Sequence, residues 1–426
     1  MSLDRRARRA VPVLVAALLL LGSAALVHTQ PLASPQLAAE AARIFHELAQ
    51  LRGLPAVGSP PRVVVRSREE RRRFITREFA RKYPPARLEA ERRALVAWGL
   101  VPPDFDLRGF LTDLVLEQAA AYYDPVAKVM VLANWLGPEE QREALAHELV
   151  HALQDRQISL DAFLAAPSGK GDEALARQAL IEGEAVALGV ERTLRQQGLD
   201  LVRLPDLAAL QRAILVSATG PTLGRAPRFF RTLLTFPYAH GLGFVHHFRR
   251  RHAWAELSRL YQDPPRSTAQ ILHPERYFDR REDPLLLTLP DLAPVLGAGA
   301  RRVIEDDMGE LGLAAILEQV LGEDAAVGHW RGDRYALWEG AAAPVLVALS
   351  AWESDVDAQA WAEAGARLLA KKHGLGAPAE TGTVTVWRVG AEGFLIERRG
   401  REVLLVERAP ATALHALRRV VWQSRP

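Results

Sequence analysis

The fold of this chain is decided by one stretch, Glu143-Ala144-Leu145-Ala146-His147-Glu148-Leu149-Val150-His151-Ala152-Leu153-Gln154-Asp155. Its apolar residues recur at helical spacing, and the preceding Gly137-Pro138 is a helix-start signal, so we expect a helix over about 139–157. Residues four apart share one face of a helix, so His147 and His151 point the same way. The stretch therefore predicts two imidazoles that can bind one metal ion.

The pattern in this stretch is H-E-x-x-H, and its glutamate is Glu148. Neutral imidazoles suit Zn²⁺, and a hydrolytic zinc site keeps one position open for water, whose pKa the metal lowers. Glu148 can take a proton from that water and pass it to a leaving amine. We therefore expect one Zn²⁺ ion held by His147 and His151, with Glu148 as the catalytic base. The alternative is a solvated helix whose two histidines bind no metal.

A third metal ligand should come from another element. The next helical pattern, 173–197, contains Leu180-Ile181-Glu182-Gly183-Glu184-Ala185, in which Gly183 would let two helices approach closely. Here the sequence resembles the gluzincin metallopeptidases, the thermolysin-like and aminopeptidase-like enzymes whose third zinc ligand is a Glu on the helix after H-E-x-x-H. This resemblance implies that Glu182 is the ligand, whereas Glu184 points about 200° away on the helix. The alternative is that Glu182 is a buried carboxylate bound to an arginine.

Two strand-like runs, 117–123 and 128–133, flank the turn signal Asp124-Pro125 before the metal helix. In thermolysin-like enzymes a strand at this place binds the substrate as an added strand, and its small-aromatic-aromatic signature resembles Ala121-Tyr122-Tyr123. The resemblance implies that these three residues bind substrate. An open strand edge offers unpaired N–H and C=O groups to an extended peptide. The alternative is an ordinary hairpin with stacked tyrosines.

Two downstream stretches, 236–241 and 267–274, resemble parts of an uncharacterised bacterial family of extracytoplasmic proteins that also carry H-E-x-x-H. They contain Tyr238 and His273. A tetrahedral intermediate needs a hydrogen-bond donor for its oxyanion, and we expect that donor to be one of these two residues. The alternatives are a core tyrosine with a bonded hydroxyl and a histidine that ends a helix.

Two acidic features have less specific interpretations. Asp155 follows His151 by four residues on the same helix face, so it is a candidate to orient a ligand histidine through a hydrogen bond. The alternative is a charged helix end. The run Glu305-Asp306-Asp307 predicts an acidic helix start, which the helix dipole favours.

The N-terminus predicts an export signal. Four arginines among residues 5–9 precede the uncharged apolar run 11–27, which together are typical of a secretory signal within residues 1–30. The alternative is an uncleaved membrane anchor formed by residues 11–27, since their number is near the short limit for a span. Both interpretations place the body outside the cytoplasm: periplasmic, secreted or membrane-anchored in a bacterium.

Composition excludes several other classes. The chain has no cysteine, which excludes disulfide scaffolds, thiolate metal sites and thiol nucleophiles. Its formal net charge is +3, and outside residues 1–25 the basic and acidic residues are equal in number, which argues against nucleic-acid binding. There is no Walker loop, no G-x-G-x-x-G after a strand and no G-x-S-x-G, so nucleotide and α/β-hydrolase chemistry lack support.

These patterns predict an α+β fold in two domains. Residues 35–322 should form a mostly helical, zincin-like metallopeptidase domain with a small β-sheet before the metal helix. Residues 328–426, with alternating strand and helix patterns, should form a two-layer α+β domain. The expected function is zinc-dependent hydrolysis of peptide bonds in an extracytoplasmic protein or peptide. The alternatives are a catalytically silent metal-binding or partner-binding protein of the same fold, a membrane-anchored protein whose motif is accidental, and a non-peptide amidase.

Overall fold

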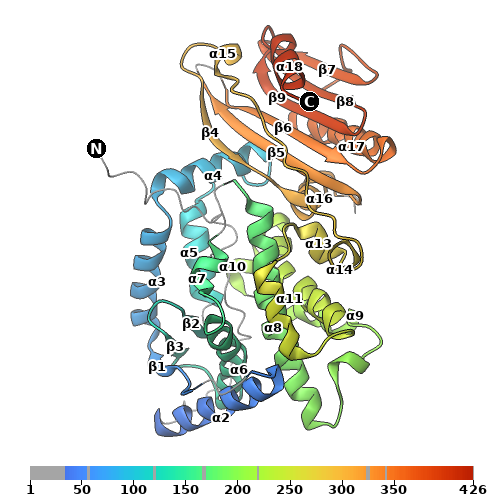
Figure 1. Ribbon diagram of the computed structural model, residues 1–426. Coiled ribbons are helices and arrows are strands. Elements are labelled where there is room, and N and C mark those ends of the chain that lie inside the picture. The colour runs from blue at the N-terminus through green and yellow to red at the C-terminus, as the bar shows by residue number, and fades with distance from the viewer. Residues whose placement is uncertain are drawn as a thin grey trace, which may run out of the picture.

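The computed structural model describes residues 34–54, 58–118, 121–165, 169–217, 220–322, 327–340 and 343–425. The predicted signal or anchor segment, residues 1–30, lies outside these described residues. Within them, no helix combines the length and apolarity that crossing a membrane would require. A helical body with one small sheet lies beneath a larger antiparallel sheet near the C-terminus (Figure 1), which confirms the predicted α+β class.

The helical body precedes the larger sheet in the chain. Its elements are α2 (Ser34–Arg52), β1 (Arg62–Arg66), α3 (Arg68–Lys82), α4 (Pro85–Trp98), α5 (Leu107–Gln118), β2 (Ala121–Asp124), β3 (Val129–Ala133), α6 (Pro138–Asp155), α7 (Leu160–Leu164), α8 (Gly171–Gln196), η1 (Leu201–Arg203), α9 (Ala208–Ser217), α10 (Pro221–Gly224), α11 (Arg228–Arg249), η2 (Trp254–Ser258), α12 (Arg259–Gln262), α13 (Thr268–Leu272) and α14 (Glu275–Phe278). The short helix α15 (Ala293–Leu296) follows them and packs against the core of the larger sheet.

The small sheet has the strand order β1-β3-β2, with β1 parallel and β2 antiparallel to β3. Strand β2 is therefore an edge strand. The predicted strand over 117–123 begins too early, because Glu117 and Gln118 complete helix α5. Buried Leu107, Leu111 and Leu114 give α5 a helical period that continues into this turn.

Helices α8 and α11 pack closely at two glycines, so the close approach that Gly183 allows is to α11 rather than to the metal helix α6. A Cβ atom on Gly183 would lie 2.3 Å from the backbone carbonyl carbon of Gly241. A Cβ atom on Gly241 would lie 2.1 Å from the carbonyl oxygen of Ala179. Only hydrogen side chains fit here, so the two helices hold a fixed separation next to Glu182.

The C-terminal elements are β4 (Arg301–Asp306), α16 (Gly309–Leu321), β5 (Trp330–Glu339), β6 (Val345–Trp352), α17 (Asp355–His373), β7 (Val384–Val389), β8 (Glu392–Arg399), β9 (Glu402–Pro410) and α18 (Leu414–Gln423). The strands form one antiparallel sheet in the order β4-β5-β6-β9-β8-β7. Side chains alternate between its faces: Leu405 packs in the core that contains α17, and Leu404 packs in the core that contains α18.

The acidic run at residues 305–307 does not begin a helix, which corrects the prediction. Glu305 and Asp306 end strand β4, where Asp306 pairs with Tyr335 of β5, and α16 starts only at Gly309. The β-branched pair Val303 and Ile304 and the pairing with β5 override the local acidic signal. Strand β4 thereby joins the C-terminal sheet although it precedes residue 322.

Candidate metal centre

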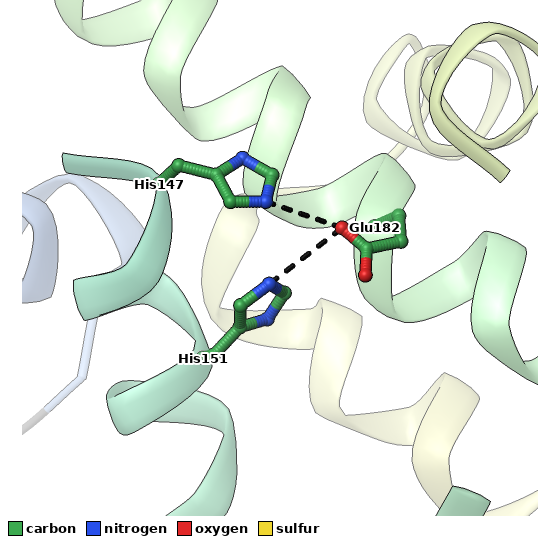
Figure 2. Close-up of side chains that lie close together, drawn as sticks. All are labelled: His147, His151 and Glu182. Carbon is green, nitrogen blue, oxygen red and sulfur yellow. Dashed lines mark hydrogen bonds and ion pairs between the residues drawn. The ribbon is translucent and has the colours of Figure 1, made fainter. Parts of the chain in front are cut away.

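Helices α6 and α8 bring three side chains together. His147 and His151 project from α6, and Glu182 projects from α8, so that both imidazoles face one carboxylate (Figure 2). The Nε2 atom of His147 lies 3.2 Å from Glu182 Oε2, and the Nε2 atom of His151 lies 3.6 Å from the same oxygen. One ligand atom from each residue lies within 4.8 Å of the others. The spacing of the motif therefore gives the shared face that the sequence predicts.

The buried atoms of this cluster fit a metal ion. Glu182 has no solvent exposure, and His151 has 3%. Glu182 Oε1 and His151 Nε2 are both buried without a hydrogen-bond partner. A set of two imidazole nitrogens and one carboxylate oxygen is typical of zinc in hydrolytic sites. Unsatisfied lone pairs at this depth are costly unless they bind a cation.

The charges of the three residues support one another. Burial raises the pKa of Glu182, but the neighbouring imidazoles outweigh that effect and hold the pKa at about 2. Burial lowers the pKa of His151, but the negative charge of Glu182 and the hydrogen bond to Gln154 raise it to about 9. The pocket thus stabilises positive charge, which a proton or a metal cation can supply.

Glu148 lies on the same helix and is tied to the small sheet. Its Oε2 atom accepts a hydrogen bond from the backbone N–H of Tyr123 in β2, at 2.8 Å. Burial raises the pKa of Glu148 to about 7, while the charges of His151 and His147 oppose that rise. A carboxylate with this pKa can both accept and donate a proton near neutral pH.

The three residues predicted to bind substrate form the first part of the edge strand. Ala121 is buried, and the ring of Tyr122 stacks on Phe74 of α3 at 5.7 Å. Tyr123 points to the other face, where its hydroxyl donates to Asp155 Oδ2 at 2.8 Å. The two tyrosines therefore do not stack on each other, and the strand lies directly beside Glu148.

Asp155 contacts groups other than the ligand histidines. Its carboxylate accepts hydrogen bonds from the Tyr123 hydroxyl, Lys128 Nζ and the backbone N–H of Leu160. The neighbour of His151 is instead Gln154, whose Oε1 atom lies 2.8 Å from His151 Nδ1. The H-E-x-x-H pattern does not single out Gln154, although its position on the buried apolar face of the metal helix is a usable signal.

Gln154 belongs to a buried hydrogen-bond network that no sequence pattern indicates. Its Nε2 atom donates to the carbonyl oxygen of Ile181 and to Glu184 Oε2, both at 2.9 Å. Glu184 also accepts hydrogen bonds from Arg52 of α2 and the hydroxyl of Tyr261. The buried glutamate paired with an arginine is therefore Glu184, and Glu182 remains with the histidines.

The two candidate oxyanion donors lie in different surroundings. Tyr238 is buried in α11, and its ring centroid lies 6.1 Å from that of His147. His273 follows α13, and its Nε2 atom lies 2.6 Å from Glu310 Oε1 on α16. The structure thus brings Tyr238 next to a ligand histidine, whereas His273 is engaged by an acidic residue of another helix.

Two parts of the chain match known family models. Residues 105–190 match the IrrE N-terminal-like domain (Peptidase_M78), and residues 297–418 match a domain of unknown function (DUF8575). No curated protein and no solved structure matches the chain. The first match spans the helix with His147 and His151 and the part of α8 with Glu182. It supports a peptidase-like hydrolase, and the three side chains are compatible with a metal ion.

Proposed function

We propose that this protein is a zinc-dependent peptidase of gluzincin type, in which His147, His151 and Glu182 hold the metal. The observation that carries the proposal is the convergence of these three residues, of which His151 and Glu182 are buried and each has a polar atom without a hydrogen-bond partner. Zn²⁺ bound there would polarise the scissile carbonyl and lower the pKa of a water molecule. The family match over residues 105–190 supports the same class of enzyme.

Glu148 is the general base of the proposed reaction. The Tyr123 N–H fixes one carboxylate oxygen, which leaves the other oxygen to receive a proton from the attacking water. The protonated Glu148 then donates to the leaving amine. Tyr238 is the better placed candidate for the donor that stabilises the oxyanion, because its ring lies beside His147. His273 is the second candidate, and its hydrogen bond to Glu310 makes it less available.

The proposed substrate is an extended peptide or a segment of a protein. Strand β2 pairs with β3 on one side only within the described part of the chain, so its other edge can pair with a peptide backbone. Such a peptide would run past Glu148, which the edge strand holds in place. We propose an extracytoplasmic location from the apolar run 11–27 and its preceding arginines.

Metal content and turnover together test this function. The wild-type chain should contain one zinc per molecule, and Glu182→Ala should lose most of it. Glu148→Gln should keep the zinc and cleave no peptide from a fluorogenic library. Unchanged turnover in Glu148→Gln would reject the proposed mechanism. Absence of metal after reconstitution at neutral pH would reject the proposal that the protein is a zinc-dependent enzyme. Zinc bound by a wild-type chain that cleaves nothing would favour the catalytically silent alternative.

A further inference from the structure

Two arginines are fully buried in the described part of the chain, and only one has polar partners. Arg52, with no solvent exposure, donates to Glu184, to the carbonyl oxygen of Trp254 and to Ser258 Oγ. Arg71 in the first turns of α3 is 1% exposed, and none of its three guanidinium nitrogens has a hydrogen-bond partner. Its guanidinium carbon instead lies 4.8 Å from the centroid of the Trp135 ring.

A ring contact does not compensate for burying an unpaired guanidinium. The attraction between a cation and an aromatic face is small compared with the lost hydration of the charge. The surroundings of Arg71 add further positive charge, because the guanidinium carbon of Arg68 lies 4.8 Å from the same Trp135 ring. Burial and the charge of Arg68 lower the pKa of Arg71 to about 10. The nearby carboxylate of Glu70 is used in a capping box with Ser67.

A second arginine with an unpartnered buried nitrogen lies at the end of the adjacent strand β1. Arg66, the last residue of β1, has a buried Nε atom without a hydrogen-bond partner. Its carbonyl oxygen accepts from the backbone N–H of Asn134, the residue before Trp135. These arginines lie at the N-terminal end of α3, where the helix dipole also favours negative charge. Donors are in excess here, and no hydrogen-bond acceptor for Arg71 lies among the residues that the structure describes.

We propose that Arg71 and Arg68 form an oxyanion-binding site beside Trp135, which takes a carboxylate or phosphate group. A guanidinium presents a planar set of donors that matches two oxygens of either group. The buried Arg71 nitrogens would be the donors that the ligand reaches. Arg68 is exposed, so its long side chain is the one that moves aside to admit the ligand.

The site lies next to the strand proposed to bind substrate. Phe74, which follows Arg71 by about one helical turn, stacks on Tyr122 of β2. Successive residues of a strand face opposite sides, so Tyr122 faces α3 while Tyr123 faces the metal helix. The oxyanion can thus be an acidic side chain of a peptide on β2 or a free ion. The peptide source rests on the proposed function, and the free-ion source does not.

Thermal unfolding and calorimetric titration of the full chain test this site at constant ionic strength. The probes are inorganic phosphate and two capped tripeptides, acetyl-Ala-Glu-Ala-amide and its Gln counterpart. We expect a saturable rise in the melting temperature with phosphate or with the Glu peptide, and no rise with the Gln peptide. A response to the Glu peptide alone would assign the site to substrate, and a response to phosphate alone would assign it to a free ion.

Matched variants distinguish binding at Arg71 from nonspecific attraction to positive charge and from binding to the metal ion. Arg71→Met should weaken binding at least tenfold without lowering the melting temperature of the free protein. Arg72→Met removes an exposed charge from the same helix and should bind as the wild type does. The same titration in Glu182→Ala, which should lack the metal, shows whether phosphate binds without it. If Arg71→Met fails to fold, Arg71→Lys, which keeps the charge but loses the planar donors, should show the same weakening. Saturable binding that either Arg71 variant leaves unchanged, or no saturable response in the wild type, would overturn the proposal.

Discussion

The backbone N–H of Tyr123 donates a hydrogen bond to the carboxylate of Glu148 over 2.8 Å, so the edge strand fixes the proposed base. The length of the glutamate side chain is then part of the geometry. Glu148→Asp withdraws the carboxylate by one methylene, so it cannot keep this bond and also reach a water molecule. We expect a loss in kcat of about 100-fold, because a displacement of about 1 Å costs this much in oriented reactions.

Steady-state kinetics and zinc analysis check this expectation together. Glu148→Asp should retain its zinc, because neither histidine is changed. Glu143→Asp makes the same change at an exposed position of α6 and should keep wild-type turnover. Wild-type kcat in Glu148→Asp would show that the position of the carboxylate does not limit the reaction.

Gln154 fixes the tautomer of His151. Its Nε2 atom faces two acceptors, the carbonyl oxygen of Ile181 and the carboxylate of Glu184, so its Oε1 atom must face His151 Nδ1. Nδ1 then carries the proton, and Nε2 keeps the lone pair that a metal requires. Gln154→Leu should weaken zinc binding by about 10- to 100-fold, measured by competition with a chromogenic chelator.

The control for this variant lies on the same helix. Gln141 is also buried, and its amide donates to the carbonyl oxygen of Leu136 away from the metal cluster. Gln141→Leu should therefore leave zinc affinity unchanged even where it lowers stability. Equal zinc affinity in Gln154→Leu and the wild type would contradict the assigned role.

The ion pair between Arg52 and Glu184 should dominate the stability of the helical body. Both side chains are at most 1% exposed, so removal of the arginine leaves a buried carboxylate with fewer partners. Arg52→Met should lower the free energy of unfolding by about 3–5 kcal/mol. Arg43 pairs with Glu40 and is 55% exposed, so Arg43→Met should change it by less than about 1 kcal/mol. Urea denaturation of both variants measures these changes. Similar losses of unfolding free energy in Arg52→Met and Arg43→Met would show that the buried ion pair contributes no more than an exposed one.

The metal cluster was predictable because its information is local. The spacing of His147 and His151 places both on one helix face, and a family resemblance supplies Glu182. The network behind them was not predictable, since Arg52 contacts Glu184 across 132 positions of the chain. A single sequence carries no signal for such a pair.

The strand boundaries show a second limit. Strands β5 to β9 follow clear apolar patterns, so a C-terminal domain with alternating strands and helices was predictable. Strand β4 was missed because its acidic end resembles a helix start, and only its pairing with β5 determines its conformation. Tertiary pairing outweighs local propensity there.

Two glycines of α8 provide a matched test of helix packing. Gly183 contacts the backbone of α11, and a Cβ atom there would meet Gly241 at 2.3 Å. Gly183→Ala should therefore lower the free energy of unfolding by about 1–3 kcal/mol or more. Gly189 has open space around its missing Cβ atom, so Gly189→Ala should raise stability by up to about 1 kcal/mol. Thermal unfolding of the pair is informative, because stabilisation by both variants would show that α8 and α11 can separate.

Asp172 should make stability depend on pH, since burial raises its pKa to about 8, with the charges of Asp333 and Glu310 adding to the rise. Hydrogen bonds from Thr268 oppose the rise. The folded chain therefore binds this proton more tightly than the unfolded chain does. The stabilisation that comes from protonated Asp172 is complete below about pH 4 and is lost as the pH rises through about 8.

Asp172→Asn imitates the protonated acid at every pH. It should therefore remove the part of the pH dependence of stability that comes from Asp172. Relative to the wild type, the variant should gain about 4 kcal/mol between pH 5 and pH 8.5, because each pH unit between the two pKa values contributes about 1.4 kcal/mol. Urea denaturation at both pH values measures the difference. Asp104→Asn, at an exposed position, should follow the wild type throughout. A constant difference between Asp172→Asn and the wild type would mean that Asp172 is already ionised in the folded chain at pH 5.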